Sequence, residues 1–154
     1  MPRSPRLVLV SAAVAALGLS ACVSHPVGPA RTFSKYEGKA VTTAKSARSA
    51  VETALLTADA TARGNSFGPY AGAVISEAEE SARGVRATFA SVQPPDERAD
   101  ALFAELDGLL AAAVGHLTEV RVAAHRNQLN ELNRVAEPLA ADSRQLQAFV
   151  DEHQ

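Results

Sequence analysis

The sequence predicts an all-α protein, an up-down-up-down four-helix bundle that follows a signal peptide and a short tether. Three observations lead to this fold class. Apolar or small residues recur at spacings of three and four in four separate segments, as they do on one face of a helix. Short stretches with proline or glycine separate these segments. Aromatic residues make up only 5% of the chain and tryptophan is absent, so the core must be built from aliphatic side chains and alanine.

Residues 1–21 have the order of parts that is typical of a secretion signal. Arg3 and Arg6 precede an apolar run, Leu7 to Leu19, that is almost entirely Leu, Val and Ala. As a helix this run would rise about 20 Å, short of the roughly 30 Å hydrocarbon core of a bilayer. We therefore expect the apolar part of a signal peptide and not a membrane span. The separation of the two arginines favours general secretion over a twin-arginine route.

The apolar run ends in Leu19-Ser20-Ala21-Cys22, which holds the sole cysteine of the chain. This tetrapeptide resembles the lipobox of bacterial lipoproteins, Leu-(Ser/Ala/Thr)-(Gly/Ala)-Cys. The resemblance implies that the Cys22 sulfur carries a diacylglyceryl group with acyl chains such as palmitate, and that the signal is cut before Cys22. A thiolate suits this role because it is the strongest nucleophile among side chains. The alternative is an ordinary signal cleaved after Ala21, which would leave a free thiol.

Residues 22–31 are expected to be a flexible tether, since Val23 to Ala30 contains two prolines and a glycine. About eight residues reach roughly 25 Å at most, so the domain would sit close to the membrane. His25 in this segment is expected to be solvated. Because Val23 and not Asp follows the cysteine, the resemblance implies the outer membrane in a bacterium with two membranes. In a bacterium with one membrane, it implies the outer face of the plasma membrane.

Residues 32–154 are expected to form the bundle, and its first two helices cover about 33–63 and 69–92. Gly64-Asn65 ends the first of these helices because glycine accepts the left-handed conformation that often follows a helix. Pro69 suits the first position of the second helix. Gly84 lies inside this second helix, where it would allow close approach of a neighbouring helix. The first stripe has Val41, Ala44, Ala47, Val51, Leu55, Ala58 and Ala62; the second has Ala71, Ile75, Ala78, Ala82, Val85, Phe89 and Val92.

The last two helices are expected over about 96–126 and 129–152. Gln93-Pro94-Pro95-Asp96 separates the third helix from the second, because a residue before proline avoids the helical region. Asn127 is available for the left-handed position after the third helix. Pro138 lies inside the stripe of the fourth helix, where we expect a kink near Arg134 to Pro138, with a break as the lesser alternative.

This topology places five aromatic residues at the end of the bundle nearest the tether. They come from the starts of the first and third helices and the ends of the second and fourth. The first explanation is that a wide end of the bundle needs large side chains to fill it. The alternative is a binding pocket or a base that touches the membrane. The five residues are Phe33, Tyr36, Phe89, Phe103 and Phe149.

Charge is distributed unevenly along a chain whose net charge is -2. This value argues against nucleic acid as a partner. The start of the first helix is basic and forms a candidate membrane-facing patch, although a solvated face is the simpler interpretation. Its residues are Arg31, Lys35, Lys39, Lys45 and Arg48. An acidic group, Glu77, Glu79 and Glu80, is expected to be solvated and to stabilise the early part of its helix.

The sequence contains no motif that names a catalytic residue, a cofactor or a metal. Bundles that hold two iron ions need Glu-x-x-His on facing helices, and this chain has only the reversed spacing, His116 to Glu119. His116 is expected to be half-buried, His125 to suit a helix C-terminus, and His153 to lie in a frayed end. We found no glycine-rich phosphate loop and no Gly-x-Ser-x-Gly. We therefore expect no cofactor and no enzyme.

The expected function is that of a lipid-anchored, extracytoplasmic protein of the cell envelope that acts as a non-catalytic interaction or accessory module. Its partners would be the membrane, through Cys22, and another envelope protein. The alternative is a bundle that carries a ligand or a metal at the membrane surface, and its cue is the row of Ser and Thr along the first helix. The domain is similar to small helical lipoproteins of high-GC bacteria. The residues that carry this resemblance are Phe67-Gly68-Pro69-Tyr70, Ser76-Glu77-Ala78-Glu79-Glu80 and Gln93-Pro94-Pro95-Asp96, and it implies no activity.

Overall fold

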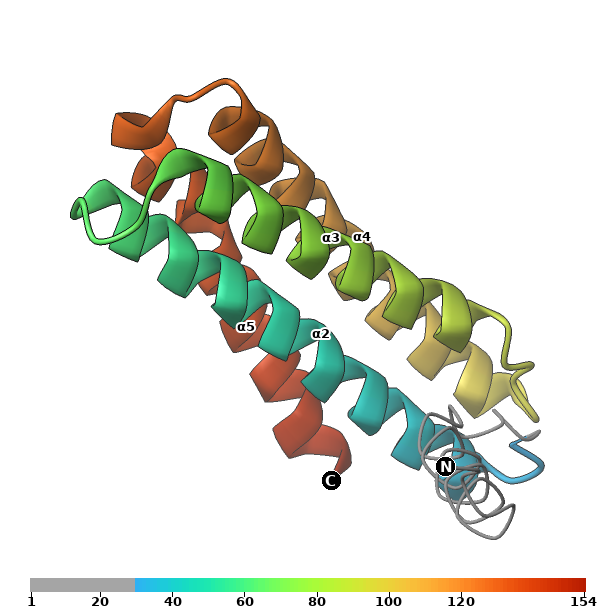
Figure 1. Cartoon of the computed structure of the whole chain (residues 1–154). Helices are drawn as coiled ribbons and strands as arrows, with labels where there is room; N and C mark the ends of the chain where they lie inside the picture. The colour runs from blue at the N-terminus through green and yellow to red at the C-terminus, as the bar shows by residue number, and fades with distance from the viewer. Residues whose placement is uncertain (1–29) are drawn as a thin grey trace, which may run out of the picture.

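The computed structural model describes residues 30–154 and confirms an all-α four-helix bundle, with no strand in this range. The helices are α2 (Phe33–Ala62), α3 (Gly68–Ala90), α4 (Glu97–His125) and α5 (Leu132–His153), and a 3₁₀ turn, η2 (Leu129–Glu131), precedes α5. Each helix runs antiparallel to the one before it (Figure 1). The predicted signal peptide, Cys22 and most of the predicted tether lie outside the described residues.

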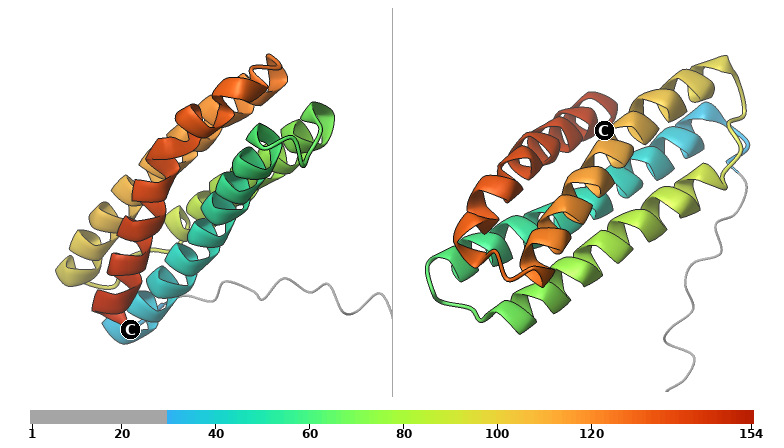
Figure 2. Two further views of the ribbon diagram at one scale, coloured as in Figure 1. Left: turned by 90° about the vertical axis from the view of Figure 1, so that its left-hand side faces the viewer. Right: turned by 90° about the horizontal axis from the view of Figure 1, so that it is seen from above.

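The bundle has two ends that differ in what they contain. The start of α2, the end of α3, the start of α4 and the end of α5 lie together at one end, called the tether end below (Figure 2). The opposite end, called the far end, holds the α2–α3 connection and the segment from α4 to α5. The two ends are separated by about 45 Å, since α2 has 30 residues that each rise 1.5 Å.

The helix boundaries follow the caps that the sequence contains. Thr32 caps α2 by accepting a hydrogen bond from the Lys35 amide at 3.4 Å, and Asp96 caps α4 by accepting one from the Ala99 amide at 3.0 Å. Gly64 and Asn127 follow α2 and α4 with φ values of 75° and 57°, the left-handed conformation that ends a helix. Predicted and observed boundaries of α2, α3 and α4 therefore agree to within two residues.

The last helix differs most from its prediction. The chain after Asn127 first forms η2, and the α-helix begins only at Leu132. Pro138 lies inside α5, which continues without interruption to His153, so the alternative of a break at this proline is wrong. A helix tolerates one missing backbone donor when its apolar face is buried on both sides of the proline, and Ala136 and Leu139 are both buried here.

The core pairs an alanine surface with leucine surfaces. About half of the buried apolar residues are alanines, and α2 supplies the longest row, Ala40, Ala44, Ala47, Ala50, Ala54 and Ala58. The large side chains come mainly from α4 and α5, which bury Leu102, Leu106, Leu110, Leu117, Leu132, Leu139 and Leu146. Because alanine allows backbones to approach closely, α2 packs against all three of the other helices, including α4 across the bundle.

Two further features concern α3 and α4. The expected close approach at Gly84 is wrong: a Cβ atom there would meet nothing within 4 Å, because this face of α3 is exposed. In residues 30–154, α4 is the helix whose length and apolar composition would suffice to cross a membrane. Helices in the core of a bundle can have the same length and apolar composition, and α4 buries nine of its residues within this bundle.

Candidate functional site

Exposed apolar side chains gather at the far end of the bundle. Within residues 30–154, the large apolar side chains that are exposed are Leu56 (70% exposed), Phe67 (68%) and Tyr70 (54%). All three line one depression of about 370 Å³, and the Phe67 and Tyr70 rings lie 5.8 Å apart. We call these three residues the apolar tip. Such clustering is informative because scattered exposed apolar residues are common, whereas contiguous ones mark contact surfaces.

The backbone of the α2–α3 connection explains how Phe67 of the apolar tip is placed. Gly64 has φ = 75° and ends α2, so the chain turns away before Phe67. Phe67 then precedes α3 with extended backbone (φ -98°, ψ 149°) and supplies no side-chain cap. A Cβ atom on Gly68 would lie 3.1 Å from Asn127 Oδ1 and 3.2 Å from Leu129 Cδ1, so the backbone here sits close to the α4–α5 segment. From the sequence, these two aromatics were noted only within Phe67-Gly68-Pro69-Tyr70, with no binding role.

At the tether end, a groove of about 410 Å³ runs between α2 and α3. Phe89 and Val92 form part of its apolar lining, Gly38 leaves it open, and Lys35 and Lys39 contribute its basic groups. A Cβ atom on Gly38 would meet nothing within 4 Å, so a larger side chain at this position would enter the groove. The groove is a second candidate site, for a molecule with an apolar part and a negative charge.

The row of Ser and Thr along α2 does not open into the core. The hydroxyls of Thr42, Ser46, Thr53, Thr57 and Thr61 each donate to the carbonyl four residues earlier, at 2.7–3.0 Å. These groups are therefore satisfied within their own helix. The alanines behind them are buried, so the interior beside α2 is closed. This closed interior counts against a ligand inside the bundle and leaves the surface groove as the place for one.

Three of the five predicted aromatics at the tether end form a row of ring contacts, in which Tyr36 and Phe89 are buried and Phe103 is partly buried. The Phe89 ring lies 5.3 Å from the Tyr36 ring and 5.9 Å from the Phe103 ring. Phe149 is buried beside His153, with ring centroids 4.5 Å apart. Phe33 lies under the Arg98 guanidinium, 4.2 Å away. Tyr36, Phe89 and Phe149 are buried, which supports the role of filling the end of the bundle, and Phe89 alone of the five lines the groove.

Tyr36 is buried completely, and its hydroxyl has no hydrogen-bond partner within the part of the chain that the structure describes. Burial raises the pKa of this hydroxyl above its ordinary value of 10.0, and the charge of Asp100 adds to the effect. An unpaired buried hydroxyl costs about 1–3 kcal/mol. We therefore expect Tyr36→Phe to be at least as stable as the wild type, with a gain of up to about 1 kcal/mol in urea unfolding. A loss above about 1 kcal/mol would show that the hydroxyl has a partner.

The five predicted basic residues do not share one face of α2. Lys35 and Lys39 are one turn apart and line the groove beside α3. Arg48 lies on the opposite edge, where it pairs with Glu52 at 2.7 Å and donates to Gln147 of α5. Lys45 is exposed between these edges, and Arg31 is exposed before the helix begins. The membrane-facing role stays a prediction, and Arg48 is the least suited to it.

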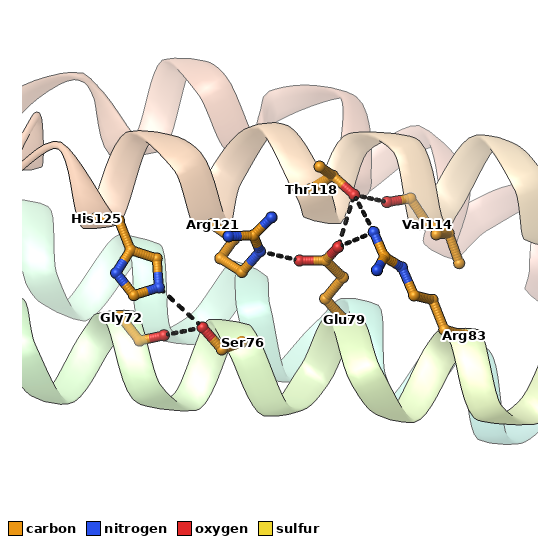
Figure 3. Close-up of polar contacts among 8 residues, drawn as sticks. All are labelled: Gly72, Ser76, Glu79, Arg83, Val114, Thr118, Arg121 and His125. Atoms are coloured by element: carbon orange, nitrogen blue, oxygen red, sulfur yellow. Dashed lines mark hydrogen bonds and ion pairs between the residues drawn. The ribbon is translucent and has the colours of Figure 1, made fainter.

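Glu79 corrects the expectation that its acidic group is a solvated face. Glu77 and Glu80 are exposed, but Glu79 is only 2% exposed and points at α4 (Figure 3). Arg121 and Arg83 form ion pairs with its two carboxylate oxygens, and the Thr118 hydroxyl lies 2.8 Å from Oε1. Burial alone would raise the pKa of this carboxyl. The hydrogen bonds from Thr118 and Arg121 and the two positive charges outweigh burial, so the pKa is lower than its ordinary value.

Other polar pairs also join neighbouring helices. Arg86 donates two hydrogen bonds to Asp107, at 2.7 and 2.9 Å, which raises the pKa of Arg86 and lowers that of Asp107. His116 Nδ1 lies 2.7 Å from Oδ2 of the buried Asp142. His116 is half-buried, as predicted from the sequence, whereas the burial of Asp142 was not predicted. These pairs fix the rotation of α3, α4 and α5, and their groups are occupied by one another.

His125 of α4 also contacts α3, through the side chain of Ser76. His125 Nε2 lies 3.1 Å from the Ser76 hydroxyl, which in turn is 2.7 Å from the Gly72 carbonyl (Figure 3). His125 ends α4, as predicted, where a histidine suits the helix C-terminus.

Comparison of the chain with protein-family models, curated proteins and solved structures finds no match.

Proposed function

We propose that this protein is a lipid-anchored, extracytoplasmic protein of a bacterial envelope that acts as a non-catalytic interaction module, and that the apolar tip binds its partner. The observation that carries the proposal is the gathering of Leu56, Phe67 and Tyr70 at the end of the bundle farthest from the start of α2. The lipobox-like Leu19-Ser20-Ala21-Cys22 supports the anchor.

The chemistry of the apolar tip favours a partner protein. Aromatic side chains dominate the energetics of protein interfaces because they bury a large area with few rotatable bonds. Tyr70, which lines the depression, also carries a hydroxyl group that can hydrogen-bond to a partner. The surrounding residues, Thr57, Asn65 and Ser66, are small and polar, so the apolar area has a polar border of the kind that protein interfaces have. The fitting partner surface is an apolar patch on another envelope protein.

Crosslinking in the bacterium, followed by mass spectrometry, tests this proposal. The tagged protein is compared with Cys22→Ala, which removes the anchor, and with Phe67→Ala/Tyr70→Ala, which removes the tip rings without touching the core. Gln128→Ala, also exposed at the far end, is the matched control. We expect one envelope protein to be recovered by crosslinking to the wild type and to Gln128→Ala. The double variant should recover about tenfold less of this protein.

Two results would contradict the proposal. Equal recovery with Phe67→Ala/Tyr70→Ala would exclude the apolar tip as the contact surface. No partner above the Cys22→Ala control would exclude the interaction function in these cells. The second result would favour the alternative function, a carrier for an anionic amphiphile in the groove between α2 and α3. The apolar lining beside Lys35 and Lys39 supports this alternative, and native mass spectrometry of the purified protein would detect the bound molecule.

A further inference from the structure

A histidine and three carboxylates from three helices converge at the tether end. His153 is the last residue of α5, Glu37 belongs to α2 and Glu105 to α4. His153 Nδ1 lies 3.4 Å from Glu37 Oε1, and Nε2 lies 3.9 Å from Glu105 Oε2. Glu152 completes the group, since ligand atoms of Glu105, Glu152 and His153 all lie within 4.8 Å of one another.

His153 is held in place, contrary to the expectation of a frayed end. Its ring packs against the buried Phe149, with centroids 4.5 Å apart, and its side chain is only 17% exposed. Nε2 is buried and has no hydrogen-bond partner among residues 30–154. Both ring nitrogens face a carboxylate, but a neutral imidazole carries only one N–H. If Nδ1–H donates to Glu37, a metal ion on Nε2 would supply the attraction to Glu105 that a bare nitrogen lone pair cannot.

The charges around this nitrogen favour a cation. In the described part of the chain, neither Glu105 nor Glu152 forms an ion pair with a lysine or arginine. Among residues 30–154, the one basic group within ion-pair distance of Glu37 and Glu105 is His153 itself. Three carboxylates thus surround a single imidazole. One nitrogen and carboxylate oxygens form a donor set that Zn²⁺ accepts, because it binds both histidine and carboxylate ligands.

Glu37 has a separate role in this arrangement. Histidines that bind metals usually present their other ring nitrogen to a carboxylate, which fixes the tautomer and the orientation of the ring. Nδ1 faces Glu37, which leaves the Nε2 lone pair directed toward Glu105. We propose that His153 Nε2, Glu105 and Glu152 bind a divalent transition-metal ion such as Zn²⁺, with Glu37 as the positioning residue. This inference is independent of the proposed interaction at the apolar tip.

Isothermal titration of the purified full-length protein in detergent with Zn²⁺, after chelator treatment, tests the site. We expect one ion per chain, confirmed by native mass spectrometry. Affinity should fall about tenfold or more in Glu37→Gln, and saturable binding should be lost in His153→Ala and in Glu105→Gln. His125→Ala is the matched control, because this histidine also ends a helix but lies at the far end. It should bind as the wild type does.

X-ray absorption at the zinc edge identifies the ligand atoms around the bound metal. This second measurement does not depend on how stable each variant is. The wild type should show one imidazole nitrogen with carboxylate oxygens around the metal. Circular dichroism confirms that each variant remains helical. Unchanged binding in His153→Ala, or no saturable binding by the wild type, would overturn the proposal.

Discussion

Replacement of Leu110 by Ala should lower the free energy of unfolding by about 3–4 kcal/mol. Leu110 is 1% exposed and belongs to the leucine surface of α4. The cost of removing a buried leucine depends on how far the neighbours can move into the space that it leaves. Alanine has no side-chain torsion and cannot swing into a cavity, and α2 presents mostly alanine to this core. We therefore expect the neighbouring alanines to leave most of the cavity unfilled.

Urea unfolding followed by circular dichroism measures this loss. Leu56→Ala is the matched control, because this leucine is 70% exposed and its truncation should change stability by no more than about 0.5 kcal/mol. A loss below about 1 kcal/mol for Leu110→Ala would mean that the helices close the cavity by moving together.

The second large effect is expected at the Glu79 network. Arg121→Met keeps most of the apolar stem of the arginine but removes the charge that pairs with Glu79 Oε2. The carboxylate would then remain buried with Arg83, which is more exposed, and with Thr118. Breaking a buried ion pair from one side is costly because the remaining charge loses its compensation. Since Arg121 is itself partly exposed, we expect a loss of about 2 kcal/mol at pH 7.

The dependence of stability on pH gives an independent check of the same network. The pKa of Glu79 is lower in the folded protein than its ordinary value of 4.5, so its contribution to stability is complete above that value. The contribution is lost as the pH falls below it toward the folded pKa. The wild type should therefore lose more stability than Arg121→Met between pH 5 and pH 3, measured by urea unfolding at each pH.

Arg126→Met is the control for both experiments, because Arg126 is exposed and forms no ion pair within residues 30–154. It should change stability by no more than about 0.5 kcal/mol. Equal losses in Arg121→Met and Arg126→Met would contradict a structural role for the Glu79 network.

The sequence predicted the bundle well because it contains clear helix-ending residues between the four segments. Gly64, the Pro94-Pro95 pair and Asn127 lie where the helices end, and the spacing of three and four marks the buried stripes between them. Local sequence controls these features, since caps and backbone preferences act within a few residues. The 3₁₀ turn before α5 was missed because the apolar spacing of Leu129 and Leu132 also fits an α-helix.

The candidate sites were less predictable because they depend on how the helices rotate against one another. Glu79 is next to a stripe position, and only its place opposite Thr118 and Arg121 shows that it is buried. Asp142 lies three residues after Leu139 and four before Leu146, a spacing that predicts burial, but its partner His116 is on another helix. His153 was expected to be frayed because it lies near the chain terminus. Only the convergence of α2, α4 and α5 places it among three carboxylates.

If Cys22 carries the proposed lipid anchor, the separation of the apolar tip from the tether end would limit where the proposed partner can be met. About 45 Å of bundle and a tether of at most about 25 Å would confine the tip to a shell within roughly 70 Å of the lipid surface. Two molecules held to the same membrane search this thin layer and not the whole compartment. Their effective concentration rises accordingly, into the range that short linkers produce. A contact surface as small as three side chains could then be sufficient, because confinement would supply much of the affinity that the interface itself lacks.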